Sequence, residues 1–382
     1  MRASAPGAGG DAAAHPETRR PVLSTLSVEV GLRAALAVAV PLVILLVVQR
    51  LDLAAYATFG AMTALYGRNE PYRLRIRSVT VGAVVLLLCI ALGTVVAALG
   101  EPLWLLVPLL LLVVAGGTVL ASTFQLLPAQ PLFFVFALLV CAAVPTPADE
   151  ILLRVGLAAA TAAFSWLLTM SGWVLRRTGR ADGGGIAPFL YKELRRRPGI
   201  DRSAVRDPRV WLTAAQNVLG VLIAGGIALA FGLGHAYWAV VSLVAVIPPA
   251  RAAHSISRSV HRIAGTIVGV GVTALLLFWA PPPLVVIVVI VVCQVVTETL
   301  VGRHYGLALV FITPMALSVS YLASPVPLTG LVVDRVLETV LGATVGILLV
   351  LVARGVERRA AFGDVGDSGD QRASGDQRAS GG

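Results

Sequence analysis

Charged residues are scarce in this chain of 382 residues, where they make up 13% against 57% hydrophobic residues, and the mean hydropathy is +0.87. So little charge excludes a water-soluble globular domain of this length. The chain holds a single lysine, Lys192, and it follows Tyr191, so no G-x-x-x-x-G-K-[ST] phosphate loop exists. No HExxH, GxSxG or aspartate-rich metal motif occurs either. We therefore expect neither an enzyme nor a bound metal or other cofactor.

Cysteine is rare as well. Cys89, Cys141 and Cys293 each lie inside an apolar run, without a CxxC motif or paired histidines nearby, which predicts small core residues. The net charge of +10 lies largely in short segments between apolar runs. Membrane topology explains that placement better than nucleic-acid binding, so no nucleic-acid partner is expected.

Long apolar runs dominate the chain, and they lack the period-2 alternation of barrel strands. About 20 apolar residues in a helix cross the hydrocarbon core of a bilayer. The runs fall at 30–49, 53–67, 79–99, 103–124, 128–146, 153–175, 210–233, 236–249, 263–280, 284–300, 305–322 and 331–353. The sequence therefore predicts an all-α polytopic membrane protein of about twelve transmembrane helices, with the lipid bilayer as its main partner.

The runs form two groups of six that are related in sequence. Tyr56 and Tyr237 open similar short segments, and Arg154-Val155 recurs as Arg335-Val336 at the same offset of 181 residues. Two homologous six-helix halves with equal orientation predict a pseudo-twofold axis along the membrane normal. The sequence leaves open whether the chain forms a homo-oligomer. The expected division is a disordered leader at 1–27, the first half at 28–175, a basic cytoplasmic linker at 176–209, the second half at 210–355 and a disordered tail at 356–382.

Arginine placement predicts the orientation. With the N-terminus inside, the inner segments hold nearly every basic residue, whereas the outer loops are short and mostly acidic. This side preference predicts a multi-pass protein of the cell membrane with both termini in the cytoplasm. The strong preference for arginine over lysine suggests a GC-rich bacterium and thus its inner membrane.

A motif in the second half resembles the FUSC family, the fusaric acid resistance and aromatic acid exporter-like membrane proteins. It comprises Tyr237-Trp238-Ala239, Pro248-Pro249, Arg251 and the stretch from Arg262 to Gly269. The first half departs from it, with GRNEP in place of the proline-rich turn and Ser78-Val79 in place of Gly-Thr. The resemblance implies export or permeation of small organic anions, often aromatic carboxylates, driven by a proton gradient or the membrane potential.

An anion site within a membrane requires buried cations or polar groups, which are unfavourable there without a function. Arg33 lies a few residues into the first run, and its counterpart in the second half is Gln216 next to Asn217. These three are candidate substrate-binding residues. Snorkelling of Arg33 to the inner headgroups remains the alternative.

Arg154 and Arg335 are candidate substrate-binding residues at equivalent helix starts on the outer side. The positive-inside rule and the helix dipole both disfavour arginine at that place, which indicates a role in the pore. The alternative is a local ion pair, since Glu150 precedes Arg154 by four residues and Glu338 follows Arg335 by three.

The second and eighth runs are short, and short helices at equivalent positions of two halves indicate a transport site. Tyr56, Tyr237 and Trp238 near their outer ends are candidates for stacking on an aromatic substrate. An interfacial aromatic belt is the alternative.

Two further sets of charged residues are candidates for guiding anions and for carrying protons. Basic residues of the inner mouth would concentrate anions there, although positive-inside topology explains them equally well. Carboxylates held partly out of water are candidates for proton coupling, with His235, His261 and His304 as alternatives. The basic set is Arg75, Arg77, Arg258 and Arg262, and the carboxylates are Glu298, Asp334 and Glu338.

Three hypotheses follow from the sequence. The first is a secondary exporter of small organic anions such as aromatic carboxylates. The second is an anion channel of the same architecture, whose flux would follow voltage and ignore pH gradients. The third is a membrane scaffold subunit that transports nothing, for which neutralising Arg154 and Arg335 would leave function intact.

Overall fold

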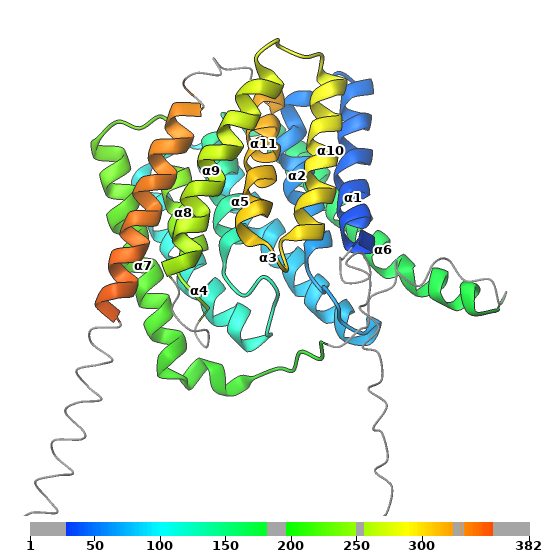
Figure 1. Cartoon of the computed structure of the whole chain (residues 1–382), viewed down its shortest axis with the longest axis horizontal. Helices are drawn as coiled ribbons and strands as arrows, with labels where there is room; N and C mark the ends of the chain where they lie inside the picture. The colour runs from blue at the N-terminus through cyan, green and yellow to red at the C-terminus, as the bar shows by residue number, and fades with distance from the viewer. Residues whose placement is uncertain (1–27, 182–195, 250–255, 324–329, 331, 354–382) are drawn as a thin grey trace, which may run out of the picture.

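A computed structural model describes residues 28–181, 196–249, 256–323, 330 and 332–353, and this part of the chain is helical, without strands (Figure 1). The expected leader and tail lie outside these residues, as do Arg251 and much of the linker. The α-helices are α1 (Val28–Val47), α2 (Ala54–Ala61), α3 (Tyr72–Ala98), α4 (Leu103–Thr123), α5 (Leu132–Ala143), α6 (Ile151–Ala181), α7 (Pro208–Ala230), α8 (Tyr237–Val246), α9 (Ile256–Leu277), α10 (Pro283–Leu300), α11 (Tyr305–Ala323) and a last helix, Val332–Ala353. Short 3-10 turns are η2 (Leu51–Leu53), η3 (Met62–Leu65), η4 (Ala148–Glu150) and η6 (Arg202–Arg206).

Nine helices in the described ranges are long and apolar enough to cross a membrane, which makes the chain a multi-pass membrane protein. Three shorter apolar helices span Leu51–Leu65, Leu132–Ala143 and Tyr237–Val246. The first and third of these coincide with the two runs expected to be short. The second was expected to extend over 128–146, but Pro131 precedes it and Val144 adopts an extended conformation before Pro145.

Helices α3 and α9 begin earlier than their apolar runs. The structure starts them at Tyr72 and Ile256, whereas the runs start at 79 and 263. The added turns carry arginines, which are good helix formers, so the chain stays helical where hydropathy falls. A helix start predicted from the end of a charged segment therefore lies about two turns too late in both helices.

The helices form two groups that meet along the middle of the bundle. The N-terminal helix group (α1 to α6) contacts the C-terminal helix group (α7 to α11 and Val332–Ala353) through α1 on α10, α2 on α11, α4 on α7 and α5 on α8. Within the groups, α3 packs on α5 and on α6, and α9 packs on α11. Figure 1 shows α1 beside α10 at one side and α7 at the other.

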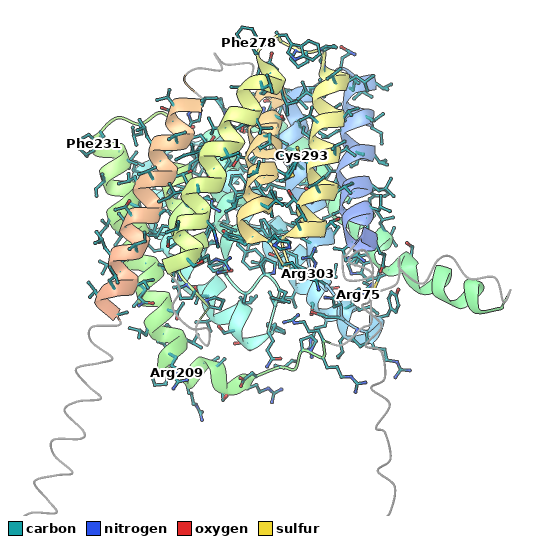
Figure 2. All side chains as sticks on the ribbon, in the orientation of Figure 1. Arg75, Arg209, Phe231, Phe278, Cys293 and Arg303 are labelled. Atoms are coloured by element: carbon teal, nitrogen blue, oxygen red, sulfur yellow. The ribbon has the colours of Figure 1, made fainter. Side chains whose placement is uncertain are left out.

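The two ends of the bundle differ in charge. Figure 2 places Phe231 and Phe278 at the upper end, and Arg75, Arg209 and Arg303 at the lower end. The described part of the linker is tied to the lower end, where Arg196 pairs with the buried Glu70 and donates to the Gln125 carbonyl. The linker enters α7 at the N-cap Asp207, whose carboxylate accepts a hydrogen bond from the Arg209 amide.

Candidate functional site

A cavity of about 680 Å³ lies between the two helix groups, within the size range of small-molecule sites. Side chains of α2, α4 and α5 line one wall, and those of α7 to α11 and the last helix line the other. Most of them are apolar. The charged side chains in the lining are Glu101, Arg258, Arg262, Glu298 and Arg335. Arginines therefore outnumber carboxylates in a largely hydrophobic enclosure.

Arg335 is the most buried of these cations, with 1% of its surface exposed. Its guanidinium carbon lies 3.7 Å from the centroid of the Trp238 ring, a cation–π contact. The Nε and Nη1 atoms of Arg335 have no hydrogen-bond partner among the described residues. Arg335 is thus a buried cation whose hydrogen-bonding capacity is partly unused.

Glu338 does not form the ion pair that its spacing from Arg335 suggested. Its Oε1 accepts a hydrogen bond from the His235 amide at 3.0 Å, just before α8 begins. The Oε2 atom has no partner among the described residues, and the side chain is fully buried. The neighbouring Asp334 contacts the Nδ1 of His235 at 2.8 Å. The acids on either side of Arg335 in the sequence therefore hold the loop that leads into α8.

Arg154 contrasts with Arg335, because all of its nitrogens are bonded. Glu150 Oε2 accepts from its Nε at 2.9 Å and from its Nη2 at 2.7 Å. The Nη1 donates to Thr146 at 2.8 Å, to the Pro145 carbonyl at 3.1 Å and to Tyr56 at 3.3 Å. The local ion pair expected as the alternative is present here, and Arg154 faces a shallow pocket at the upper end, outside the central cavity.

Exposed charges surround that shallow pocket. Arg50 bonds to Asp52 and to Glu150, with shortest distances of 3.0 and 3.1 Å. The hydrogen bond to Asp52 raises the pKa of Arg50 above its usual value. The resulting chain Asp52–Arg50–Glu150–Arg154 neutralises the upper end of the N-terminal helix group.

Arg258 and Arg262 line the cavity one helical turn apart on α9. Arg258 donates to the Ala245 carbonyl at 2.9 Å and stacks over Tyr305 at 4.4 Å. Arg262 donates to Ser242 at 3.4 Å, and its Nε has no partner among the described residues. Each of the three arginines contacts a different residue along α8. Trp238 contacts Arg335, Ser242 contacts Arg262, and Ala245 contacts Arg258. The three arginines therefore lie at successive depths over about 10 Å of α8.

Aromatic rings cross the cavity from one helix group to the other. Phe59 of α2 meets Phe136 of α5 edge to face at 5.0 Å, and Phe136 lies 4.9 Å from Trp238 of α8. Tyr237 continues the series at 5.1 Å from Trp238. All four residues line the cavity. They provide flat apolar surfaces next to the Arg335 guanidinium.

Glu298 and Arg68 join the two helix groups at the lower end of the cavity. Arg68, in the segment between η3 and α3, pairs with Glu298 of α10 at 2.8 Å and also donates to its carbonyl. Arg33 lies near Glu298 and Arg75 and contacts Glu29 at 3.6 Å, while two of its nitrogens have no partner among the described residues. Glu298, one of the three carboxylates expected to couple protons, is therefore part of a contact between the groups.

The cavity unites some of the expected site residues and leaves others aside. Those that line it are Tyr237, Trp238, Arg258, Arg262, Glu298 and Arg335. Those that do not are Arg33, Tyr56, Arg75, Arg77, Arg154, Gln216, Asn217, Asp334 and Glu338. Arg75 instead stacks on Tyr72, Arg77 donates to the Pro198 carbonyl, and Asn217 bonds to the Thr213 carbonyl of its own helix.

Sequence reasoning missed several lining residues. Gln294 and Thr297 precede Glu298 on one face of α10, and such a polar stripe in an apolar run was a readable signal. Phe59 and Phe136 stand among many apolar residues in the sequence, so nothing in the sequence distinguishes them as lining residues. The pairing of Arg68 with the lining residue Glu298 was missed as well, because helical spacing carries no sign of a contact between residues 230 positions apart.

Comparisons with known proteins support the resemblance. Residues 213–349 match the profile of the family described as fusaric acid resistance protein-like. A curated relative, "Uncharacterized membrane protein YvaC" of Bacillus subtilis (strain 168), is 26% identical over 175 residues, which are 44% of this chain and 27% of that protein. The chain thus matches only about a quarter of the length of this relative. No solved structure matches the chain. Residues 213–349, which carry Trp238, Arg262 and Arg335, are thus similar to the fusaric acid resistance-like (FUSC) family, the family that the motif of the second half resembles.

Proposed function

We propose that the chain is a secondary transporter that exports small organic anions, such as aromatic carboxylates, across the bacterial inner membrane. The observation that carries this proposal is Arg335, a buried arginine with unpartnered nitrogens that lines an apolar cavity. An unpaired arginine at membrane depth is unfavourable by about 2.5 to 3.5 kcal/mol on insertion scales. A carboxylate would offset that cost, because its two oxygens match the guanidinium fork.

The aromatic rings support an aromatic substrate. A ring attached to the bound carboxylate would meet Trp238 and Phe136, which lie 4.9 Å apart in the cavity wall. Offset or edge-to-face contacts between rings add about 0.5 to 1.5 kcal/mol beyond burial. An aliphatic acid of equal charge would lack this contribution, so aromatic carboxylates should bind more tightly.

The arginine series supports a route through the bundle. Arg258, Arg262 and Arg335 offer cations at successive depths beside α8. An anion that enters at the lower end would pass from one guanidinium to the next instead of crossing a purely apolar barrier.

A two-half architecture with twelve spans is part of the proposal. The three short apolar helices fall where the second, fifth and eighth spans were expected. Exchanging the helix groups turns the contact of α1 with α10 into that of α7 with α4, and the contact of α2 with α11 into that of α8 with α5. Both resulting contacts occur, which supports a pseudo-twofold axis along the membrane normal.

The lower end is proposed to face the cytoplasm, with both termini inside. Arg75, Arg209 and Arg303 lie at this end, in keeping with the excess of basic residues in cytoplasmic loops (Figure 2). The upper end carries Asp52, Glu101 and Glu150 around its shallow pocket. Export would therefore run from the arginine-rich end to the acidic end.

Uptake of radiolabelled benzoate into inverted membrane vesicles tests the proposal. At pH 8, where almost all benzoate is ionised, we expect uptake that requires a proton gradient with an acidic vesicle interior. Arg335→Gln should reduce the initial rate by about 30-fold or more, whereas Arg50→Gln, which neutralises an arginine outside the cavity, should retain it. Uptake that follows voltage alone would indicate a channel, and no uptake of any aromatic or aliphatic acid would contradict transport altogether.

A further inference from the structure

The chain carries two copies of one arginine site, and they are used differently. Arg154 of α6 and Arg335 of the last helix stand 181 residues apart, as do Tyr56 and Tyr237 on the short helices that face them. Each guanidinium rests against an aromatic ring of its short helix, Tyr56 at 5.3 Å and Trp238 at 3.7 Å. Trp238 stands one position after Tyr237, the counterpart of Tyr56, so the two arginines have similar but not identical surroundings.

The copies differ in their carboxylate. Glu150, four residues before Arg154, binds it side-on through Nε and Nη2 at 2.9 and 2.7 Å. The position four residues before Arg335 is Leu331, an apolar residue that lies outside the described part of the chain. No acid of the described residues lies within ion-pair distance of Arg335, because Glu338 accepts its hydrogen bond from the His235 amide.

The copies also differ in what they face. Arg154 borders the shallow pocket at the upper end, where Arg50 adds a second bond to Glu150. Arg335 borders the central cavity, together with Trp238 and Phe136. Its Nε and Nη1 lack partners among the described residues, and Nε is one of the two atoms through which Arg154 holds Glu150.

We infer that Glu150 occupies in the N-terminal helix group the place that a substrate carboxylate takes in the C-terminal helix group. The first arginine site is filled permanently by Glu150. For the second, the sequence has a leucine and no acid four residues before Arg335. The chain therefore holds one anion at Arg335 and none at Arg154. This inference rests on the proposed transport of organic anions and adds the number, position and binding geometry of the anion.

A carboxylate introduced at position 331 should imitate Glu150 and block the site. Leu331→Glu would place an acid four residues before Arg335, at the spacing of Glu150 and Arg154. Benzoate binding to the purified full chain in detergent is measured by isothermal titration calorimetry, with Leu331→Gln as the uncharged control of the same shape. The wild type should bind one benzoate per chain, Leu331→Gln should bind alike, and both Leu331→Glu and Arg335→Gln should bind about 30-fold more weakly or not at all.

The outcomes separate the inference from the proposed function. Two benzoates per chain, half of the binding left in Arg335→Gln, or wild-type affinity in Leu331→Glu would overturn the inference while transport stands. Should Arg335→Gln fail to fold, the Leu331→Glu and Leu331→Gln pair decides alone. A wild-type chain that neither binds nor transports benzoate, salicylate or succinate would overturn both.

Discussion

Three buried or partly buried arginines in this protein have three different kinds of partner. Arg154 holds a carboxylate from its own helix start, and Arg68 holds one from the other helix group. Arg335 has the Trp238 ring at 3.7 Å and no ion-pair partner among the described residues. A ring face stabilises a desolvated cation by about 2 kcal/mol, less than a bonded carboxylate does. The cation is therefore held in place and still able to bind an anion.

Replacing the ring tests this arrangement. We expect Trp238→Ala to weaken benzoate binding about tenfold, because both the cation–π contact and the ring surface for the substrate are lost. Trp238→Phe should retain most of the affinity. Trp211→Ala, which removes a half-exposed tryptophan from the lower end of α7, serves as the control and should bind like the wild type. Equal binding by the Trp238→Ala and Trp211→Ala variants in calorimetry would refute a role for the Trp238 ring.

Helical spacing predicted two local ion pairs, and one of them forms. Glu150 and Arg154 pair as expected, whereas Glu338 turns toward the His235 amide at the start of α8. The spacing of i, i+3 and i, i+4 residues describes one helix alone, so it cannot anticipate a backbone donor 103 positions away. Only the tertiary structure shows that Arg154 has a carboxylate partner and that Arg335 has none among the described residues.

At the scale of elements, glycines let the short helix α8 approach the last helix closely. A Cβ on Gly342 would collide with the Ala239 carbonyl and lie 3.0 Å from the Ser242 Cβ. Gly60 of α2 makes the matching approach to Ala158 of α6. Backbone contacts of this kind are typical of helix packing in membranes and fix the position of Trp238 relative to Arg335.

Substitution at Gly342 should therefore loosen this interface. We expect Gly342→Ala to destabilise the protein by about 1 to 3 kcal/mol through overpacking. Gly271→Ala is the matched control, because a Cβ at Gly271 of α9 meets nothing within 4 Å and should be neutral or slightly stabilising. Melting temperatures in detergent compare the two, and equal values would show that the close approach of α8 does not matter.

The Arg68–Glu298 pair should control access to the cavity from the lower end. With the reporter Met315→Cys, which lines the cavity, Arg68→Gln should speed labelling by a membrane-impermeant maleimide from the cytoplasmic side by about 5- to 30-fold. The three native cysteines are buried, and the exposed Arg73→Gln provides the control. If Arg68→Gln leaves the labelling rate unchanged, the Arg68–Glu298 pair does not close the cavity at its lower end.

Element lengths followed from the sequence where proline or hydropathy decided them. The short second and eighth runs were expected, and prolines on both sides of α5 explain why it is shorter than its apolar run. The early starts of α3 and α9 were not expected, because arginines end an apolar run without ending a helix.

At the scale of the whole molecule, the cavity lies between the two helix groups and belongs to neither alone. The N-terminal helix group supplies apolar and aromatic wall, including Phe59 and Phe136, while the C-terminal helix group supplies all three arginines. The similarity to the fusaric acid resistance-like family also lies in the C-terminal helix group, since residues 213–349 match the profile of that family. We propose that the two helix groups arose by duplication and that later sequence divergence confined anion binding to the C-terminal helix group.

A counterflow experiment shows whether this cavity carries organic anions through the membrane. Proteoliposomes of the purified chain are loaded with unlabelled benzoate and diluted at pH 8 into a trace of radiolabelled benzoate, with protein-free liposomes as the background. We expect a transient accumulation of label above its equilibrium level in the wild type and in Arg50→Gln, and none in Arg335→Gln. Label that never exceeds equilibrium in the wild type, or an equal overshoot in Arg335→Gln, would contradict this expectation.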